Sequence, residues 1–196
     1  MLESRPNRTN AEILLLAGGA ARRFPGKLLH PIGGTPILVR TYEALERTGW
    51  NIRILCDGAL PPEIEAALDV PVTIDRLPYR GPLFALRDAC RALRCDYVFA
   101  AAADLPAIDS DVVQQIVQAW QPGDDGVVPV HDASIEPLAA IYRRRAILAA
   151  WPGLRRDGLR SMHALVERLA TRFVPLPARY FVNVNRPSDL AAVDIA

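Results

Sequence analysis

The sequence predicts an α/β domain in which a mainly parallel sheet is covered by helices on both faces, a three-layer α/β/α sandwich. Short apolar runs of strand length alternate with segments of helical periodicity along most of the 196 residues. Hydrophobic residues make up 51% of the chain and charged residues 23%, which is a globular balance. No repeat or linker divides the sequence, so we expect a single domain over residues 1–196, with residues 1–10 as a flexible polar tail.

The first half of the chain alternates strands with helices. Residues 96–102 are apolar almost throughout, which is typical of a central strand that is covered on both faces. Ser110 is suited to cap the helix that follows. The predicted strands are 12–16, 51–55, 70–74 and 96–102, and the predicted helices are 36–48, 61–68, 82–93 and 110–120.

The second half is less regular. Its predicted strands are 126–130 and 137–142, its extended pieces 172–176 and 181–183, and its helices 143–150, 161–170 and 187–193. The alternation as a whole predicts a Rossmann-like sheet. Because ligands of such sheets bind beyond the carboxyl ends of the strands, near a topological switch point, the loops after the strands are the candidate site.

Composition excludes several classes of function. The net charge of +1 gives no field of one sign for nucleic acid or an anionic membrane. The longest apolar stretches are of strand length, well short of the ~20 residues of a membrane span. The three cysteines match no metal or redox spacing, and His30, His131 and His163 are scattered. We therefore expect a cytoplasmic protein that binds neither nucleic acid nor membrane.

The loop after the first predicted strand is a candidate phosphate-binding segment. Gly18 and Gly19 allow a sharp turn and a close approach of backbone N–H groups to a ligand. Arg22, Arg23 and Lys27, the only lysine of the chain, can hold a polyphosphate by charge-assisted hydrogen bonds. The spacing fits neither a Walker A loop nor a dinucleotide fingerprint. The alternative interpretation is a glycine-rich turn with solvated arginines.

Three further segments place polar groups at the same predicted edge. Asp104 follows the apolar run 96–102, and a carboxylate there suits Mg²⁺, which prefers hard oxygen ligands. Gly81 and Pro82 begin a helix whose N-terminus carries a partial positive charge. Asn183 and Asn185 alternate by two, so their amides face one side of an extended segment. Capping and turn roles are the alternative for each of these segments.

Four motifs in this order resemble those of the MobA-like NTP transferases, over roughly residues 13–193. They are L-A-G-G-x-x-x-R-F-x-x-K from Leu16 to Lys27, Asp75 with Gly81-Pro82-Leu83, the Asp-x-Pro motif at Asp104, and Asn183-Val184-Asn185-Arg186-Pro187. The resemblance implies a fold like that of the nucleotide-diphospho-sugar transferases. It also places the segment 135–138 on the acceptor side of the cleft.

The resemblance implies a role for each matching residue. Arg23, Lys27 and Asp104 would be catalytic, with Asp104 as the ligand of Mg²⁺. Asp75, or else Asp57 after the second strand, would accept hydrogen bonds from a guanine base. The nucleotide site would comprise Leu16, Ala17, Gly18, Gly19, Lys27, Asp57, Asp75, Gly81, Pro82, Asn183 and Asn185.

The expected reaction is transfer of GMP from GTP to the phosphate of molybdopterin, with pyrophosphate released and molybdoenzyme-maturation proteins as further partners. The alternatives are cytidylyl or other nucleotidyl transfer to molybdopterin or to a sugar, alditol or lactyl phosphate, and an inactive nucleotide-binding regulator. Residues 24–27 are shorter than the guanylyltransferase motif and lack its acidic residue, which favours the other nucleotidyl transfers. Arg186 stands where threonine is usual, and the intact Arg23, Lys27 and Asp104 argue against an inactive regulator. The arginine-rich segment 143–160 could bind an anion or a partner, or be a solvated face.

Overall fold

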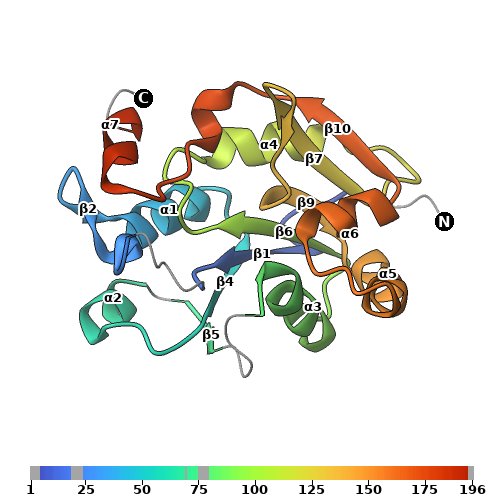
Figure 1. The fold of residues 1–196 in the computed structure, drawn as a ribbon, viewed down its shortest axis with the longest axis horizontal. Coiled ribbons are helices and arrows are strands. Elements are labelled where there is room, and N and C mark those ends of the chain that lie inside the picture. Colours follow the sequence, from blue (N-terminus) through green and yellow to red (C-terminus); the bar gives the residue numbers. More distant parts are fainter. Residues whose placement is uncertain (1–4, 19–23, 69, 75–79, 194–196) are drawn as a thin grey trace.

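The computed structural model describes residues 5–18, 24–68, 70–74 and 80–193 (Figure 1). It confirms the predicted class, because a mostly parallel sheet carries helices on both faces. The strands of this sheet are β1 (Ala11–Leu16), β4 (Asn51–Cys56), β5 (Val72–Ile74), β6 (Tyr97–Ala102), β7 (Gly126–His131), β8 (Ser134–Ile135), β9 (Ala139–Arg143) and β10 (Thr171–Pro175). A separate two-stranded sheet pairs β2 (Pro31–Ile32) with β3 (Thr35–Pro36).

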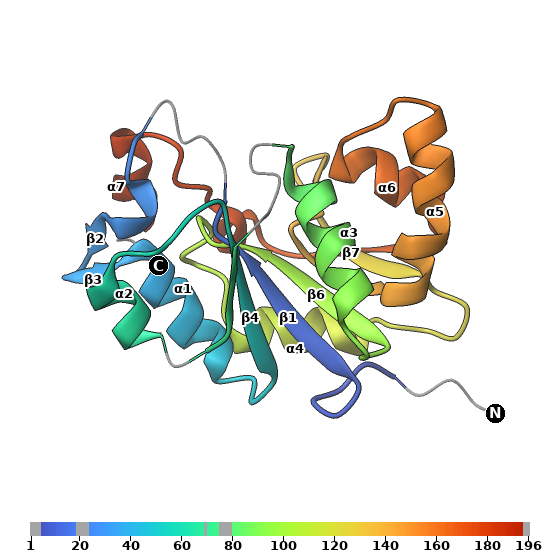
Figure 2. The ribbon, with the colours of Figure 1, turned by 90° about the horizontal axis from the view of Figure 1, so that it is seen from below.

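The strand order is β10-β7-β9-β6-β1-β4-β5, with β8 paired to β7. β1 lies between β4 and β6 and is parallel to both, as Figure 2 shows. β9 is antiparallel to its neighbours β6 and β7. The chain builds outward from β1 to β5 and then crosses back to β6 on the other side of β1. The topological switch point therefore lies between β1 and β6, at their carboxyl ends.

Helices pack on both faces of the large sheet, and each face has its own hydrophobic core. α1 (Ile37–Glu46), α2 (Pro62–Ala67) and α4 (Ser110–Gln118) pack on one face, and α3 (Pro82–Ala92), α5 (Arg144–Arg156) and α6 (Met162–Arg168) pack on the other. Short turns of helix are η1 (Lys27–Leu29), η2 (Ala178–Phe181), η3 (Pro187–Asp189) and α7 (Leu190–Val193). All residues of β6 are buried, which confirms the central position predicted for 96–102.

Several boundaries differ from the predictions for physical reasons. Asp109 rather than Ser110 caps α4, because its side chain accepts from the N–H of Val112 at 2.9 Å. α5 continues through Pro152 to Arg156, because Leu154 is fully buried in the core beneath it. Packing of this kind outweighs the loss of one helical hydrogen bond at a proline. The segment 181–183 was predicted to be extended, but its first residue, Phe181, is the last residue of η2.

Residues 5–10 of the expected tail form a hydrogen-bonded turn against the sheet. The carbonyl oxygen of Asn10 accepts from the N–H groups of Asp96 and Tyr97 at 2.9 and 3.1 Å. Along the described ranges, no helix is both long and apolar enough to cross a membrane.

Candidate active site

A cavity of about 160 Å³ lies at the switch point, beyond the carboxyl ends of β1, β4 and β6. Seven residues that the sequence assigned to the site line it: Leu16, Gly18, Lys27, Asp57, Gly81, Pro82 and Asp104. The other lining residues are Leu28, Leu55, Cys56, Ala85, Ala102 and Leu138. The structure therefore brings together six separate stretches of the sequence. Of the remaining assigned residues, Gly19, Arg23 and Asp75 lie outside the described residues, as does Arg22.

The backbone after β1 brings Gly18 against the end of β4. The N–H of Ala17 donates to the carbonyl oxygen of Leu55 at 2.7 Å, which extends the parallel pairing beyond the strand. The N–H of Ala17 is therefore already engaged within the sheet. A Cβ atom added to Gly18 would overlap the carboxylate of Asp57, so any larger residue here would force the side chain of Asp57 or the loop to shift.

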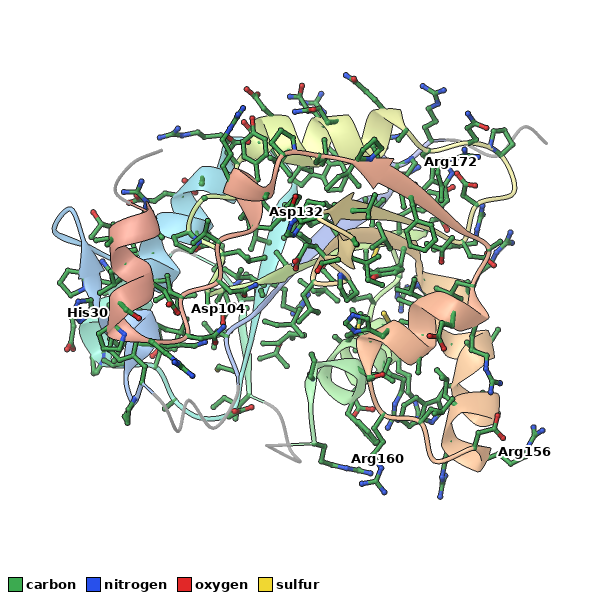
Figure 3. All side chains as sticks on the ribbon, turned by 45° about the horizontal axis from the view of Figure 1, so that its top comes forward. His30, Asp104, Asp132, Arg156, Arg160 and Arg172 are labelled. Carbon is green, nitrogen blue, oxygen red and sulfur yellow. The ribbon has the colours of Figure 1, made fainter. Side chains whose placement is uncertain are left out.

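Lys27, Asp104 and Asn185 meet at the edge of the cavity. Nζ of Lys27 contacts Oδ2 of Asp104 and donates to Oδ1 of Asn185 at 3.0 Å. The side chains of Lys27 and Asp104 are only 15% and 20% exposed, so the ion pair is partly shielded from water. Asp104, labelled in Figure 3, lies two residues past Ala102, the last residue of β6, which pairs with Leu16 at the end of β1. This ammonium, carboxylate and amide form the chemical centre of the site.

The segment that carries Asn185 is fixed by backbone hydrogen bonds. The N–H of Val184 donates to the carbonyl oxygen of Asp104 at 3.0 Å. Oδ2 of Asp189 accepts from the N–H groups of Asn185 and Arg186, both at 2.8 Å. These two hydrogen bonds lower the pKa of the Asp189 carboxyl below its ordinary value. Asn185, rather than Asn183, is the asparagine that contacts Lys27.

α3 begins at the opposite wall of the cavity. Gly81 adopts φ 97°, a backbone conformation that favours glycine, and Pro82 is the first helical residue. The N–H groups of the first turn of such a helix suit a phosphate or another anion. Arg80 lies over the ring of Phe84, with the guanidinium carbon 4.2 Å from the ring centroid.

Oxygen donors at the centre of the site fit a divalent metal ion. The carboxylate of Asp104 and the amide oxygen of Asn185 both contact the ammonium group of Lys27, so these two oxygens already attract one cation. Over the described ranges, no cluster of three or more His, Cys, Asp or Glu side chains could hold a metal. Mg²⁺ is commonly held by one or two carboxylates together with substrate phosphates, which is the donor set that Asp104 would provide.

Sequence reasoning missed a side-chain pair between His131 and Glu136. Nε2 of His131 lies 2.9 Å from Oε1 of Glu136, and the imidazole stacks on Phe181 with ring centroids 5.1 Å apart. β7 and β8 place the two residues together across a hairpin in which Val130 is opposite Ile135. The pairing depends on the register of this hairpin, which the sequence pattern did not reveal.

The arginine-rich segment 143–160 is not one continuous surface. Arg143 is buried, donates to the carbonyl oxygen of Asp124 at 3.0 Å and lies 3.5 Å from Oδ1 of Asp125. Arg144 donates to backbone carbonyl groups at the end of α3 and beyond it. Figure 3 shows Arg156 and Arg160 on the α5 side, away from Asp104. Part of the segment is therefore structural.

A doubly wound sheet with a glycine turn, an ammonium and a carboxylate at its switch point defines an α/β enzyme that acts on nucleotides. The model of the MobA-like NTP transferase domain matches residues 13–172. The chain therefore belongs to the MobA-like NTP transferase family and is a nucleotidyltransferase.

Similar proteins cover nearly the whole chain. It is 32% identical to a probable molybdenum cofactor guanylyltransferase of Haloferax mediterranei, over 97% of this chain and 96% of the relative. It is 30% identical to the molybdenum cofactor guanylyltransferase of Mesorhizobium japonicum, over 91% of each chain. Among solved structures, molybdopterin-guanine dinucleotide biosynthesis protein A of Archaeoglobus fulgidus superposes with a TM-score of 0.75 at 22% identity, covering 94% of this chain and 97% of that chain. At that identity the likeness is one of fold.

Proposed function

We propose that this protein transfers GMP from GTP to the phosphate of molybdopterin, with Mg²⁺ as its metal, and that pyrophosphate is released. The observation that carries the proposal is the meeting of Lys27, Asp104 and Asn185 at the mouth of a cavity lined by Gly18 and Gly81. Relatives at 30% and 32% identity that are named guanylyltransferases support the choice of nucleotide and acceptor.

The reaction requires positioning and charge neutralisation more than proton transfer. An oxygen of the acceptor phosphate forms a bond to the α-phosphorus of GTP, and the bond from that phosphorus to the pyrophosphate oxygen breaks. The acceptor phosphate is already ionised at neutral pH, so a general base is not required. Bringing two substrates into line accounts for much of the barrier reduction in such transfers.

The position of each residue at the site suggests its role in this reaction. Lys27 would neutralise the triphosphate as charge moves toward the leaving pyrophosphate, and Arg23 is proposed to act with it. Asp104 would hold Mg²⁺, which supplies Lewis-acid polarisation of phosphate oxygens when it is bound. Asn185 would orient Lys27. In the first turn of α3 the N–H of Leu83 would face a phosphate, because Pro82 has no N–H and the N–H of Phe84 donates to the carbonyl oxygen of Gly81.

Selectivity for guanine is assigned to a carboxylate. Asp57 lines the cavity beside Gly18, and a carboxylate can accept from both the N1–H and the 2-amino group of guanine. Asp75 is the other candidate. Cytosine does not offer the same pair of donors, so GTP is expected to bind more tightly than CTP.

The proposal includes a cellular compartment and protein partners. The chain would work as one domain in the cytoplasm, where its three free cysteines would stay reduced. Molybdoenzyme-maturation proteins would receive the product.

A pyrophosphate-release assay tests the proposal directly. GTP, CTP, ATP and UTP are each offered with Mg²⁺, with and without molybdopterin. Release that requires both GTP and molybdopterin is the expected result. Release with CTP in place of GTP would contradict the base assignment, and nucleotide binding without release would contradict the acceptor.

A further inference from the structure

Lys27 is the counter-ion of Asp104 in this structure. Its Nζ contacts Oδ2 of Asp104 and is held in place by a 3.0 Å hydrogen bond to Asn185. Both partners of the ion pair are mostly buried, so solvent and salt screen the attraction less than at an exposed surface. Along the described ranges no other lysine or arginine forms an ion pair with Asp104. Among the described residues, Lys27 is therefore the one that balances the charge of this carboxylate.

The proposed reaction assigns these two side chains to different partners. Asp104 has to bind a divalent cation, and Lys27 has to bind the triphosphate. A divalent cation and an ammonium in contact with the same carboxylate would repel each other at short range. This repulsion weakens the contact between Lys27 and Asp104 once a metal ion is bound to the same carboxylate.

We propose that Lys27 is an exchangeable internal counter-ion, which leaves Asp104 for the triphosphate when metal and nucleotide bind together. A metal ion alone has to displace the ammonium, with no anion present to receive it. A nucleotide alone draws the ammonium away and leaves the Asp104 carboxylate uncompensated near the triphosphate. Joint binding satisfies all four charged groups. The inference rests on the proposed function and adds that metal and nucleotide binding are positively coupled through Lys27.

The exchange requires little movement of the backbone. Lys27 is the first residue of η1, where its N–H donates to the carbonyl oxygen of Phe24 at 3.2 Å and its carbonyl oxygen accepts from His30 at 3.1 Å. A lysine side chain has a flexible four-carbon stem with a compact charge at its end. The ammonium can therefore change partners by rotation of its own side chain while η1 stays in place.

Replacement of Lys27 by methionine tests the exchange, because the stem is kept and the charge is removed. Mn²⁺ binding to the nucleotide-free protein is measured from the electron paramagnetic resonance signal of free Mn²⁺. We expect Lys27→Met to bind Mn²⁺ about fivefold more tightly than the wild type, the effect of removing a competing ion pair. The same variant should bind GTP more weakly. One substitution would thus change the two affinities in opposite directions, which general damage to the site would not do.

Matched variants test whether the change in Mn²⁺ affinity comes from the charge of Lys27. Lys27→Arg keeps a cation beside Asp104 and should leave Mn²⁺ affinity close to that of the wild type. Lys27→Gln should behave as Lys27→Met does, which covers the case in which methionine disturbs the fold. In an Asp104→Asn background, Lys27→Met should give no gain, because the carboxylate that the two cations share has been removed.

Unchanged or weaker Mn²⁺ binding in folded Lys27→Met and Lys27→Gln would overturn the proposal. A gain that persists in the Asp104→Asn background would overturn it as well. The measurement uses Mn²⁺ alone, without GTP or an acceptor. It therefore stays readable even if the wild type releases no pyrophosphate with molybdopterin, an outcome that would contradict the proposed function instead.

Discussion

At the residue scale, the centre of the site was predictable because its chemistry depends on residue types at fixed places beside strands. Asp104 follows an apolar strand and Lys27 follows a glycine turn, so the parallel sheet brings both to one edge. The contact of Asn185 with Lys27 could not be predicted, since it depends on the path of residues 176–185 across that edge. The pairing of His131 with Glu136 was missed for a similar reason, because it depends on hairpin register.

Replacement of Asp104 by alanine is the first prediction at this scale. Loss of the metal ligand should lower kcat by about a hundredfold or more, which is typical for removal of a group that stabilises transition-state charge. The free energy of unfolding should fall by about 1–3 kcal/mol, because the mostly buried ammonium of Lys27 loses its carboxylate partner but keeps Asn185. Pyrophosphate release and thermal unfolding measure the two effects. Unchanged Mg²⁺-dependent turnover would remove Asp104 from the mechanism.

Gly18→Ala is the second prediction, and it comes with a matched control. The new Cβ would overlap the carboxylate of Asp57, so the loop or Asp57 has to shift within the nucleotide cavity. We expect GTP affinity to fall about tenfold, which corresponds to ~1.4 kcal/mol of lost binding free energy. Gly58→Ala has open space around its Cβ and should bind GTP like the wild type. Isothermal calorimetry compares the two, and equal affinities would contradict the close-approach argument.

At the element scale, propensity predicted where most helices and strands lie, and packing decided where they end. Pro152 predicts a helix end, but Leu154 is fully buried and Trp151 packs edge-on against Phe84 of α3, with ring centroids 4.9 Å apart. α5 therefore runs past the proline. The segment 181–189 has no repeating apolar pattern, so its form follows from individual hydrogen bonds that a sequence does not display.

Asp189 gives the prediction for this element, because its carboxylate holds the turn that presents Asn185. Its pKa is lowered in the folded protein by the N–H groups of Asn185 and Arg186. A lowered carboxyl pKa means that its stabilising contribution is present above the pKa of the unfolded chain and is lost as pH falls through the folded value. Asp189→Asn should therefore be less stable than the wild type at neutral pH, and the difference should vanish in acid.

Thermal unfolding of both proteins across a pH series measures this difference. Ser188→Ala is a suitable control, because Ser188 makes only a long 3.4 Å contact with the same carboxylate. A difference between Asp189→Asn and the wild type that stays constant into acid would show that the carboxylate charge is not involved.

At the scale of the whole molecule, the alternation of strands and helices predicts the class but not the complete strand order. The sequence predicts that 12–16 and 96–102 are buried, and buried strands tend to be neighbours. The insertion of β9 antiparallel between β6 and β7 depends on a short connection through β8, which sequence patterning does not encode strongly. The fold matters to function because it assembles one cavity from residues 16, 18, 27–28, 55–57, 81–85, 102–104 and 138.

A site assembled from so many segments couples ligand binding to global stability. GTP with Mg²⁺ should bind only the folded chain, and at a hundred times its Kd a ligand adds ~2.7 kcal/mol to the free energy of unfolding. For a domain of this size such a gain raises Tm by roughly 5–10 °C. Lys27→Met should lose most of the shift, whereas Arg156→Met, which removes an exposed cation on α5 away from Asp104, should keep it (Figure 3). Differential scanning fluorimetry with GTP and CTP measures the shifts. An equal shift with CTP would contradict recognition of guanine by a carboxylate, and equal shifts in the two variants would contradict the role of Lys27 in holding the triphosphate.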